Sequence, residues 1–508
     1  MKLLSLTYNQ PNNAAQAYEF NFANGREIGR KFEPLCFVGL NGSGKSKLIE
    51  LIAEIFFTLD ANREFANSSN EQKNCKANFE LCYQLRPNRK YGFIKVVGVL
   101  GKKPQVLVGE DEQVLSMSEY MNILPSNIVG YSSGHNETIS PAFYGLRRKE
   151  LEQINYNVSK QGQTGVQDTT RTLFLDRDTT KLLLISAFIF ENKTGRNNFP
   201  PKKALIKLLK KFSEIINIEQ LISFQLIIDT NKNKIVLSQR MEQAIAKLCD
   251  CALLFNKDLA EKERRFELDF VINEKTKEVI TSQFRHPQEF FEVLYELSSL
   301  NLYFNRGRTP HLVFSIPDED LKVILNKPLA ETTYKHLSDG EHQFIQVFTS
   351  AVLFARDDSI FLLDEPESHF NPAWRAKFIF LLEELLGESQ KSTEFLISTH
   401  SPYLVSACKK SNVIKFVRDE NGVEHRPLKD ETYGASFDVL LKALFGMKGL
   451  VSEVAKNKMR EIINSNDSSE VKIEKLGDGF GDSYEKRLLV NLLKKGVLDA
   501  VDSKANAD

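Results

Sequence analysis

The sequence predicts an α/β fold with a nucleotide-binding core, a small antiparallel β subdomain and an insertion of helices and β-hairpins. Three apolar segments, typical of buried strands, carry this prediction: Leu35–Val38, Ile360–Leu363 and Phe395–Thr399. A glycine-rich loop follows the first segment, two acids follow the second, and His400 follows the third. Strands that run into such residues indicate a core that binds a phosphorylated ligand.

Composition and charge are those of an ordinary globular protein. Of the 508 residues, 42% are hydrophobic and 26% charged, and Lys plus Arg equal Asp plus Glu at 67 each. Zero net charge argues against a protein coated by nucleic acid, although a local basic face stays open. The six cysteines lack paired CxxC spacing, so we expect reduced core thiols. The longest apolar stretch, Leu182–Phe190, is too short to span a bilayer, and we expect a cytoplasmic protein without a membrane partner.

The loop Gly39–Ser46 is the first motif with clear chemistry. It fits the phosphate-binding pattern G-x-x-x-x-G-K-[ST], and apolar residues at helical spacing follow it from Leu48 to Phe56. Backbone N–H groups of such a loop close around phosphate oxygens, and the next helix adds its positive end. We expect Lys45 to reach the β- and γ-phosphates of ATP and Ser46 to ligate Mg²⁺. The predicted nucleotide-binding residues here are Gly39, Asn41, Gly42, Ser43, Gly44, Lys45 and Ser46.

Short strands surround this motif in the first part of the chain. Met1–Thr7 and Tyr18–Phe22 are predicted to form a hairpin across a Pro-Asn-Asn turn. Arg63–Asn74 is polar and predicts a mobile loop, and short β-rich runs between Phe79 and Val108 predict a small antiparallel sheet. Ile128–Tyr131 is a further predicted strand.

The middle of the chain predicts an insertion. Asn157–Arg171 is polar with almost no apolar anchor, so we expect disorder there. Helices are predicted at Asp178–Glu191, Lys202–Ile215, Gln239–Phe255 and Pro287–Leu300, and hairpins at Phe224–Ile228 with Ile235–Leu237 and at Phe266–Ile272 with Glu278–Ile280. No heptad pattern is sustained, which argues against a long coiled-coil arm.

The second motif block lies far downstream. Ile360–Glu365 is an apolar strand ending in two acids, a Walker B pattern in which Asp364 holds Mg²⁺ and Glu365 orients and deprotonates the attacking water. Leu337–Glu341 precedes a helix that leads into this strand. Pro366–Pro372 follows the acids directly, and His400 ends the next strand.

These motifs, in this order, resemble the ABC-type ATPase superfamily, with its signature loop, Walker B strand, D-loop and switch histidine. The resemblance covers about residues 1–60 and 330–420. The spellings LSDGE, EPESHFNP and STHSP, together with Glu431–Ser436, are similar to a narrower group of SMC-like ATPases from prokaryotic anti-phage and restriction-linked systems. That group includes Septu-type ATPases and the ATPase half of overcoming-lysogenization-defect nucleases, and KFEPLCFVGLNGSGKS resembles restriction-system-associated ATPases of the AAA family.

The resemblance implies an ABC-type ATPase head that hydrolyses ATP with Mg²⁺ as a head-to-tail homodimer or a higher even oligomer. Glu365, His400 and Lys45 would be catalytic, and Ser46 and Asp364 would hold the metal. Ser338 and Gly340 would contact the γ-phosphate bound by the other subunit. The glutamine of a Q-loop is not obvious, because Tyr131–Gly134 occupies about that place.

Plainer interpretations stand beside these. Without the other motifs, a histidine such as His400 more often has a structural role than a catalytic one. His369 is expected to cap a helix or to pack against neighbouring side chains. Asp176–Asp178 and Asp318–Asp320 look like nuclease DxD motifs, although acidic first turns of helices are the commoner cause. The lysines at positions 202, 203, 207, 210 and 211 form either a solvated helix face or a contact with nucleic acid or a partner.

We predict four parts: residues 1–138 and 331–445 as the two halves of the ATPase head, 139–330 as an insertion, and 446–508 as a helical segment. The predicted function is a regulatory ATPase of an anti-phage system that controls a separate effector, a nuclease or toxin. The alternative is an SMC-like DNA repair or maintenance ATPase that binds DNA directly. A transporter subunit fits worse because of the long insertion, and a one-chain ATPase-nuclease lacks a convincing acidic domain after His400.

Overall fold

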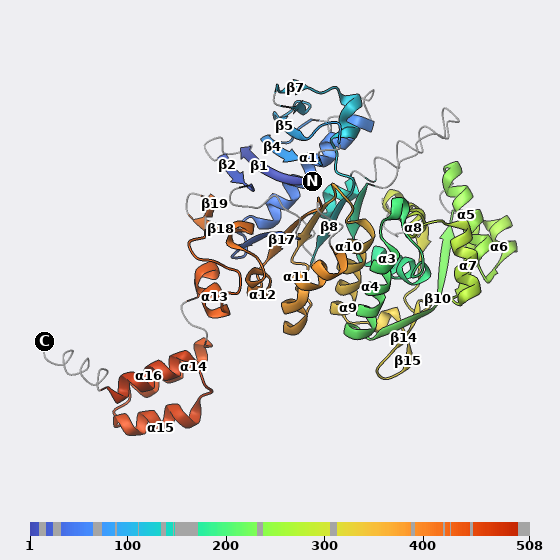
Figure 1. The fold of residues 1–508 in the computed structure, drawn as a ribbon. Coiled ribbons are helices and arrows are strands. Elements are labelled where there is room, and N and C mark those ends of the chain that lie inside the picture. The colour runs from blue at the N-terminus through green and yellow to red at the C-terminus, as the bar shows by residue number, and fades with distance from the viewer. Residues whose placement is uncertain are drawn as a thin grey trace. The chain divides into compact units, whose positions relative to one another are not determined.

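The protein is described by a computed structural model, shown as a ribbon in Figure 1. The described residues are 1–9, 17–23, 32–64, 74–86, 89–109, 111–133, 139–145, 147, 171–230, 237–304, 312–387, 392–419, 422–426, 428–447 and 451–495. Most of the expected loop at 63–74 and almost all of 157–171 lie outside them. The chain divides into two compact units, Met1–Gly434 and Ala435–Asp508.

A seven-stranded sheet forms the centre of the first unit. Its order is β19-β18-β3-β17-β16-β8-β9, and all neighbours are parallel except β18 and β19. The three apolar runs singled out in the sequence form β3, β17 and β16, each fully buried as continuous apolar strands of parallel sheets are. The strands are β3 (Leu35–Gly39), β8 (Ile128–Ser132), β9 (Thr172–Leu175), β16 (Ile360–Asp364), β17 (Glu394–Thr399), β18 (Val413–Asp419) and β19 (Gly422–Arg426).

The predicted antiparallel subdomain is a six-stranded sheet of order β2-β1-β4-β5-β6-β7. The expected hairpin of the first two strands is present, with Tyr8 opposite Tyr18. The strands are β1 (Lys2–Asn9), β2 (Ala17–Asn21), β4 (Asn78–Gln84), β5 (Phe93–Gly98), β6 (Gln105–Val108) and β7 (Gln113–Val114).

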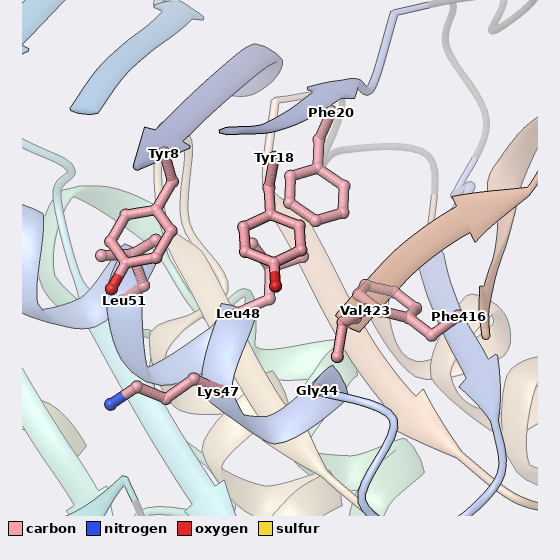
Figure 2. A pocket seen from close by; sticks show the side chains of 9 residues that line it. All are labelled: Tyr8, Tyr18, Phe20, Gly44, Lys47, Leu48, Leu51, Phe416 and Val423. Carbon is pink, nitrogen blue, oxygen red and sulfur yellow. The ribbon is translucent and has the colours of Figure 1, made fainter. Parts of the chain in front are cut away.

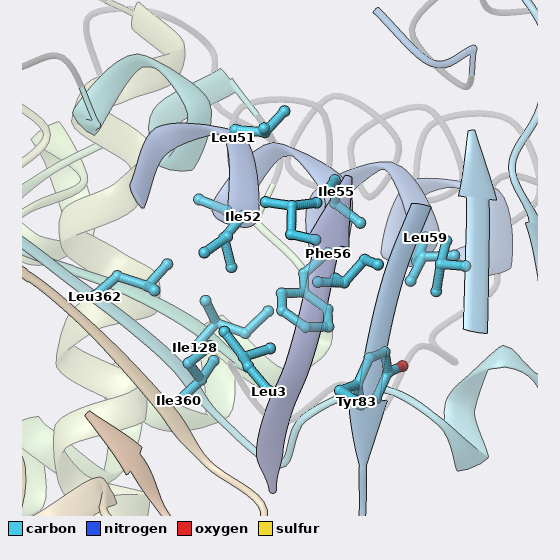
Figure 3. Close-up of a cluster of buried hydrophobic side chains, with 14 of the residues drawn as sticks. Leu3, Leu51, Ile52, Ile55, Phe56, Leu59, Tyr83, Ile128, Ile360 and Leu362 are labelled. Carbon is cyan, nitrogen blue, oxygen red and sulfur yellow. The ribbon is translucent and has the colours of Figure 1, made fainter. Parts of the chain in front are cut away.

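Helix α1 (Lys45–Glu64) lies between these two sheets. Most of its side chains are buried, and Lys47, Glu50 and Glu54 form a polar stripe along it. Figure 3 shows Ile52 and Phe56 of α1 packed among Leu3 of β1, Tyr83 of β4 and Ile360 of β16. The helix that begins at the glycine-rich loop is therefore held rigidly by both sheets.

The insertion contains a third sheet of order β11-β12-β10-β14-β15, with helices packed around it. Its strands are β10 (Ile218–Asp229), β11 (Leu254–Phe255), β12 (Arg265–Val271), β13 (Phe314–Ser315), which also pairs with β10, β14 (Lys322–Leu325) and β15 (Ala330–Thr333). Its helices are α3 (Arg177–Ile189), α4 (Lys202–Ile215), α5 (Gln239–Cys251), α6 (Lys257–Glu263), α7 (Glu274–Gln283) and α8 (Pro287–Phe304).

Two predictions in this region are wrong. The return strand expected at Glu278–Ile280 is part of α7, because Asn273 caps that helix by accepting from the backbone N–H of Thr276 and Ile280 is its buried anchor. The helix expected to reach Phe255 ends at Cys251, where Ala252 turns extended and β11 begins. The hairpin partner expected at Ile235–Leu237 falls almost wholly outside the described residues.

The two DxD-like segments have structural roles. Asp176 caps α3 with a complete capping box, as an acidic first turn predicts. Asp318 lies in a turn rather than a helix, and its carboxylate is 2.6 Å from the Lys181 ammonium. Neither segment forms a metal site, and no cluster of three or more histidine, cysteine or acidic side chains within the described ranges does so.

A segmented helix leads into β16. It comprises α9 (Asp339–Phe344), a π-helical stretch over Ile345–Thr349, and α10 (Ser350–Phe354). After β16 come α11 (Pro372–Leu386) and, beyond β17, the short α12 (Pro402–Ser406). This order places the predicted signature loop at the start of the helix and the predicted D-loop between β16 and α11.

The second unit contains α13 (Phe437–Phe445), α14 (Glu453–Ile463), α15 (Ser469–Gly479) and α16 (Tyr484–Lys494). Its small core joins Met459, Leu476 and Leu493 of the last three helices. A helical C-terminal segment was predicted, and the four-part division of the chain stays a prediction. In neither unit does a helix within the described ranges combine the length and apolarity needed to cross a membrane.

Candidate functional site

The predicted site residues meet at the carboxyl ends of adjacent parallel strands. The glycine-rich loop leaves β3, His400 follows β17, and Asp364 ends β16. In register, Asp364 is opposite Ser398 of β17 and Ser132 of β8. The edge of a parallel sheet at which neighbouring strands end is the usual ligand position in α/β folds.

Lys45 is 5% exposed and lies at the centre of this group. Its ammonium donates to the carbonyls of Gly39 (3.1 Å) and Leu40 (3.2 Å) and to Nε2 of His400 (2.9 Å). Burial lowers the pKa of Lys45, and burial with the nearby ammonium lowers the pKa of His400 to about 4. His400 is therefore neutral at pH 7, and Lys45 carries the positive charge beside it.

Ser46 and Asp364 are in direct contact. The Ser46 hydroxyl donates to Oδ1 of Asp364 at 2.9 Å, the Ser398 hydroxyl also donates to Oδ1, and the Ser132 hydroxyl lies 3.4 Å from Oδ2. Hydroxyl and carboxylate oxygens are the ligands that Mg²⁺ prefers. The oxygen donors at this point therefore fit the metal expected from the sequence.

Glu365 has an unusual backbone conformation. Its φ is +50°, in the left-handed region that side chains other than glycine rarely adopt. Its carboxylate lies 3.5 Å from Nε2 of His400 and is 40% exposed. Burial and then the neighbouring Asp364 raise its pKa, which makes it a better proton acceptor.

The glycine-rich loop is packed on one side and exposed at its tip. Ser43 is buried, and within the described part of the chain its hydroxyl has no hydrogen-bond partner. Gly44 has a φ of +96°, and a Cβ there would lie 3.1 Å from Val423 of β19. Asn41 is exposed at the tip of the loop, where Gly42 accepts a 3.3 Å hydrogen bond from Arg418 of β18. The loop needs glycine both for conformation and for space.

An aromatic pocket opens beside the start of α1. Tyr8, Tyr18 and Phe20 of the β1–β2 hairpin form one wall, Phe416 and Val423 of the β18–β19 hairpin form another, and Gly44 lies at the edge (Figure 2). The cavity volume of the pocket is about 60 Å³. An apolar space bounded by aromatic rings next to a phosphate-binding loop has the character of a nucleobase site.

The predicted signature residues lie at the start of α9. Ser338 caps this helix through a capping box with Glu341. Gly340 packs so tightly against the D-loop that a Cβ would lie 2.9 Å from the carbonyl oxygen of His369. Within one chain, no hydrogen bond between described residues joins Ser338 to the glycine-rich loop.

Three further residues belong to the site and were not predicted: Ser132, Ser398 and Gln343. Ser132 lies in the segment where a Q-loop glutamine was sought, and it contacts Asp364 instead. The two serines do have a sequence signal, because each is the last or the next-to-last residue of an apolar strand. The buried amide of Gln343 left no signal beyond a polar residue on an apolar helix face.

Glu367, two residues after Glu365, gives a testable pH dependence. It is fully buried, bonds to the Thr399 hydroxyl, and burial raises its pKa to about 7. A raised pKa means that stability is complete below the ordinary value of 4.5 and is lost as pH rises through 7. Glu367→Gln should therefore be more stable than wild type at pH 8, by about 3 kcal/mol at most, and within about 1 kcal/mol of it at pH 5. Thermal unfolding at both pH values measures this difference.

The control is Glu319→Gln, at an exposed carboxylate whose pKa is lowered by Lys335. Its titration lies below this pH window, so it should leave the slope between pH 5 and 8 unchanged. Equal slopes for wild type and Glu367→Gln would contradict the assignment.

Parts of the chain are similar to known proteins. Residues 257–406 match the family described as AAA domain, putative AbiEii toxin, Type IV TA system. The Septu protein PtuA of Bacillus thuringiensis is 26% identical over 134 residues, which cover 24% of this chain and 33% of that protein. Protein ea59 of Escherichia phage lambda is 26% identical over 138 residues, 27% of this chain and 25% of that protein. The matches thus span a third or less of either relative.

Solved structures with detectable similarity include an Smc head bound to the C-winged helix domain of ScpA, at 12% identity and a TM-score of 0.37 over 84% of this chain and 98% of that chain. A second is an Smc head with an extended coiled coil bound to the C-terminal domain of ScpA derived from Pyrococcus furiosus. Its identity is 15% and its TM-score 0.34, over 84% of this chain and 96% of that chain.

The matched family segment includes the signature helix, the Walker B strand and His400. The glycine-rich loop lies outside that segment, and the sheet brings it to the same edge. The resemblance recognised in the motif spellings is confirmed by the similarity to the Septu protein. The chain has an α/β fold with a phosphate-binding loop, and a segment of it is similar to the Septu protein PtuA.

Proposed function

We propose that the protein binds ATP with Mg²⁺ at this site and hydrolyses it. The main support is that Lys45 contacts His400 directly and Ser46 contacts Asp364 directly. These contacts join the ends of three adjacent strands. Ser46 and Asp364 would hold Mg²⁺, which would neutralise charge on the phosphates. Adenine would occupy the aromatic pocket beside Gly44.

In hydrolysis, the Glu365 carboxylate accepts a proton from a water molecule whose oxygen attacks the γ-phosphorus. The bond between that phosphorus and the β–γ bridging oxygen breaks, and ADP leaves. Lys45 exchanges its loop carbonyls for phosphate oxygens. That exchange releases Nε2 of neutral His400, which donates to the γ-phosphate in the tautomer that carries the proton on Nε2.

We further propose that two chains associate head to tail, so that Ser338 and Gly340 of one reach the nucleotide on Lys45 of the other. Two facts support this: Ser338 begins a helix with its hydroxyl at the positive end, and within one chain it has no hydrogen bond to the loop among described residues. Each composite site would then require both chains.

The biological role that we propose is regulation of a separate effector, a nuclease or toxin, in anti-phage defence. It is supported by the similarity to the Septu protein and by the long insertion outside the nucleotide core. Direct nucleic-acid binding by the lysines of α4 has weaker support. Lys210 and Lys211 pair with Glu214, and Lys211 also pairs with Glu384.

The test of this role is co-purification with the products of neighbouring genes, followed by phage plating. We expect a partner to purify with the protein and plating efficiency to rise at least tenfold when Glu365→Gln replaces wild type, because control of the effector needs the ATP cycle. Glu383→Gln, at an exposed site on α11, should protect like wild type. A protein that purifies alone and leaves plating unaffected by either substitution would favour DNA maintenance.

A further inference from the structure

Gln343 is a buried amide at the junction of the signature helix and the D-loop. It is 1% exposed. Its Oε1 accepts from the backbone N–H of His369 at 3.0 Å. Its Nε2 donates to the Tyr131 hydroxyl at 2.7 Å and lies 3.2 Å from the Ser368 hydroxyl and 3.4 Å from the carbonyl oxygen of Glu365.

Apart from Tyr131 of β8, these partners belong to the turn that begins at Glu365. The backbone N–H of Ser368 donates to the carbonyl of Glu365 at 3.2 Å and closes that turn. Gln343 contacts both of its ends. On the other side, the N–H of Glu365 donates to the carbonyl of Ser398 at 3.1 Å. The turn is therefore held from the signature helix on one side and from β17 on the other.

The turn needs such support. A left-handed φ at a residue with a side chain is strained and persists only where neighbours impose it. The direction of the Glu365 carboxylate depends on this conformation. A buried amide with matched partners fixes geometry in a way that an apolar side chain of equal size cannot.

Gln346, three residues along the same helix, provides a comparison. It is also buried, at 8% exposed, and its amide donates to the carbonyl of Asp176 at 2.8 Å. That contact joins the helix to α3 and not to the Walker B turn. Two buried glutamines on one helix thus hold different neighbours, and only Gln343 holds the turn of the proposed catalytic base.

We propose that Gln343 is a positioning residue for ATP hydrolysis, which sets the Glu365 carboxylate by holding the turn from Glu365 to His369. This rests on the proposed function. In the head-to-tail arrangement, Gln343 lies one turn and a half from Ser338 of the same chain, which touches the partner's nucleotide. Each chain's base is thereby tied to the helix that senses the nucleotide on the other chain.

The experiment compares Gln343→Met with Gln346→Met, since methionine keeps length and volume and removes the amide. For Gln343→Met we expect kcat to fall about 10- to 100-fold, the effect of a displaced catalytic group, with an unchanged Kd for ATP. Gln346→Met should lose a similar amount of thermal stability and keep the wild-type kcat. Gln343→Glu retains an acceptor for His369, loses the donor, and should also lose kcat.

Mixed dimers separate positioning from damage to the signature helix. Gln343→Met mixed with Ser338→Arg should regain activity, because one composite site then has an intact Glu365 turn and an intact Ser338. Gln343→Met mixed with Glu365→Gln should regain none, since both sites then lack a positioned base. The opposite pattern would place the Gln343 defect in trans and overturn the proposal.

A wild-type kcat in both Gln343→Met and Gln343→Glu would overturn this inference and leave the proposed function standing. Absence of hydrolysis in wild type and in Gln346→Met, with partner and Mg²⁺ present, would instead remove the proposed function and the inference with it.

Discussion

Glu365→Gln is expected to lower kcat for ATP hydrolysis by about 10²- to 10⁴-fold, the usual contribution of a general base. The amide cannot accept the proton of the attacking water, whereas the Lys45 and Ser46 contacts to phosphate are unchanged. ATP should therefore bind with wild-type affinity and hold two chains together. Phosphate release measures the first effect, calorimetry the second, and light scattering with ATP and Mg²⁺ the third.

Glu383→Gln on the exposed face of α11 is the matched control and should hydrolyse ATP normally. Retention of more than about a third of the wild-type kcat in Glu365→Gln would contradict the assignment of the base, because that change lies far below what general-base catalysis contributes.

Lys45→Ala is expected to weaken ATP binding by about 10- to 100-fold, because a charge-assisted contact to phosphate contributes about 1.5 to 3 kcal/mol. The substitution also leaves Nε2 of His400 without its donor. Calorimetric titration with ATP and Mg²⁺ measures the loss. Lys76→Ala, at a 73% exposed lysine that pairs with Glu54 of α1, should bind ATP like wild type.

Mixing Lys45→Ala with Ser338→Arg extends this prediction to the dimer. Each variant alone lacks a complete site. In a mixed dimer one composite site carries both substitutions and the other carries neither, so up to half of the wild-type activity should return. Mixed dimers that form and stay inactive would contradict shared sites.

Most of the site was predictable because its residues belong to strand ends with strong local patterns. The apolar runs before Gly39, Asp364 and His400 fixed three strands, and the spacing of Gly39–Ser46 fixed the loop. The two errors in the insertion have a local cause. Near Glu278, a short apolar run after a turn fits a strand and a helix equally well, and the Asn273 cap decides for the helix.

The contacts between segments could not be predicted. The role proposed for Gln343 depends on hydrogen bonds that its amide makes with Tyr131 and His369, which are far from it in the sequence. No local sequence pattern predicts such contacts. The aromatic pocket combines Tyr18 with Val423 for the same reason. Long-range register decides these contacts, and one sequence contains no direct signal for it.

The pairing of β3 has a consequence for the timing of synthesis. Both of its sheet neighbours, β17 and β18, come from the last quarter of the chain, and Arg418 reaches across 376 positions to Gly42. At a translation rate of about 5 to 20 residues per second, the P-loop strand would wait roughly 20 to 80 s for them. Throughout that interval the nascent chain carries an apolar strand, Leu35–Val38, without its final partners. The proposed ATP site can therefore be completed only after residue 419 has been synthesised.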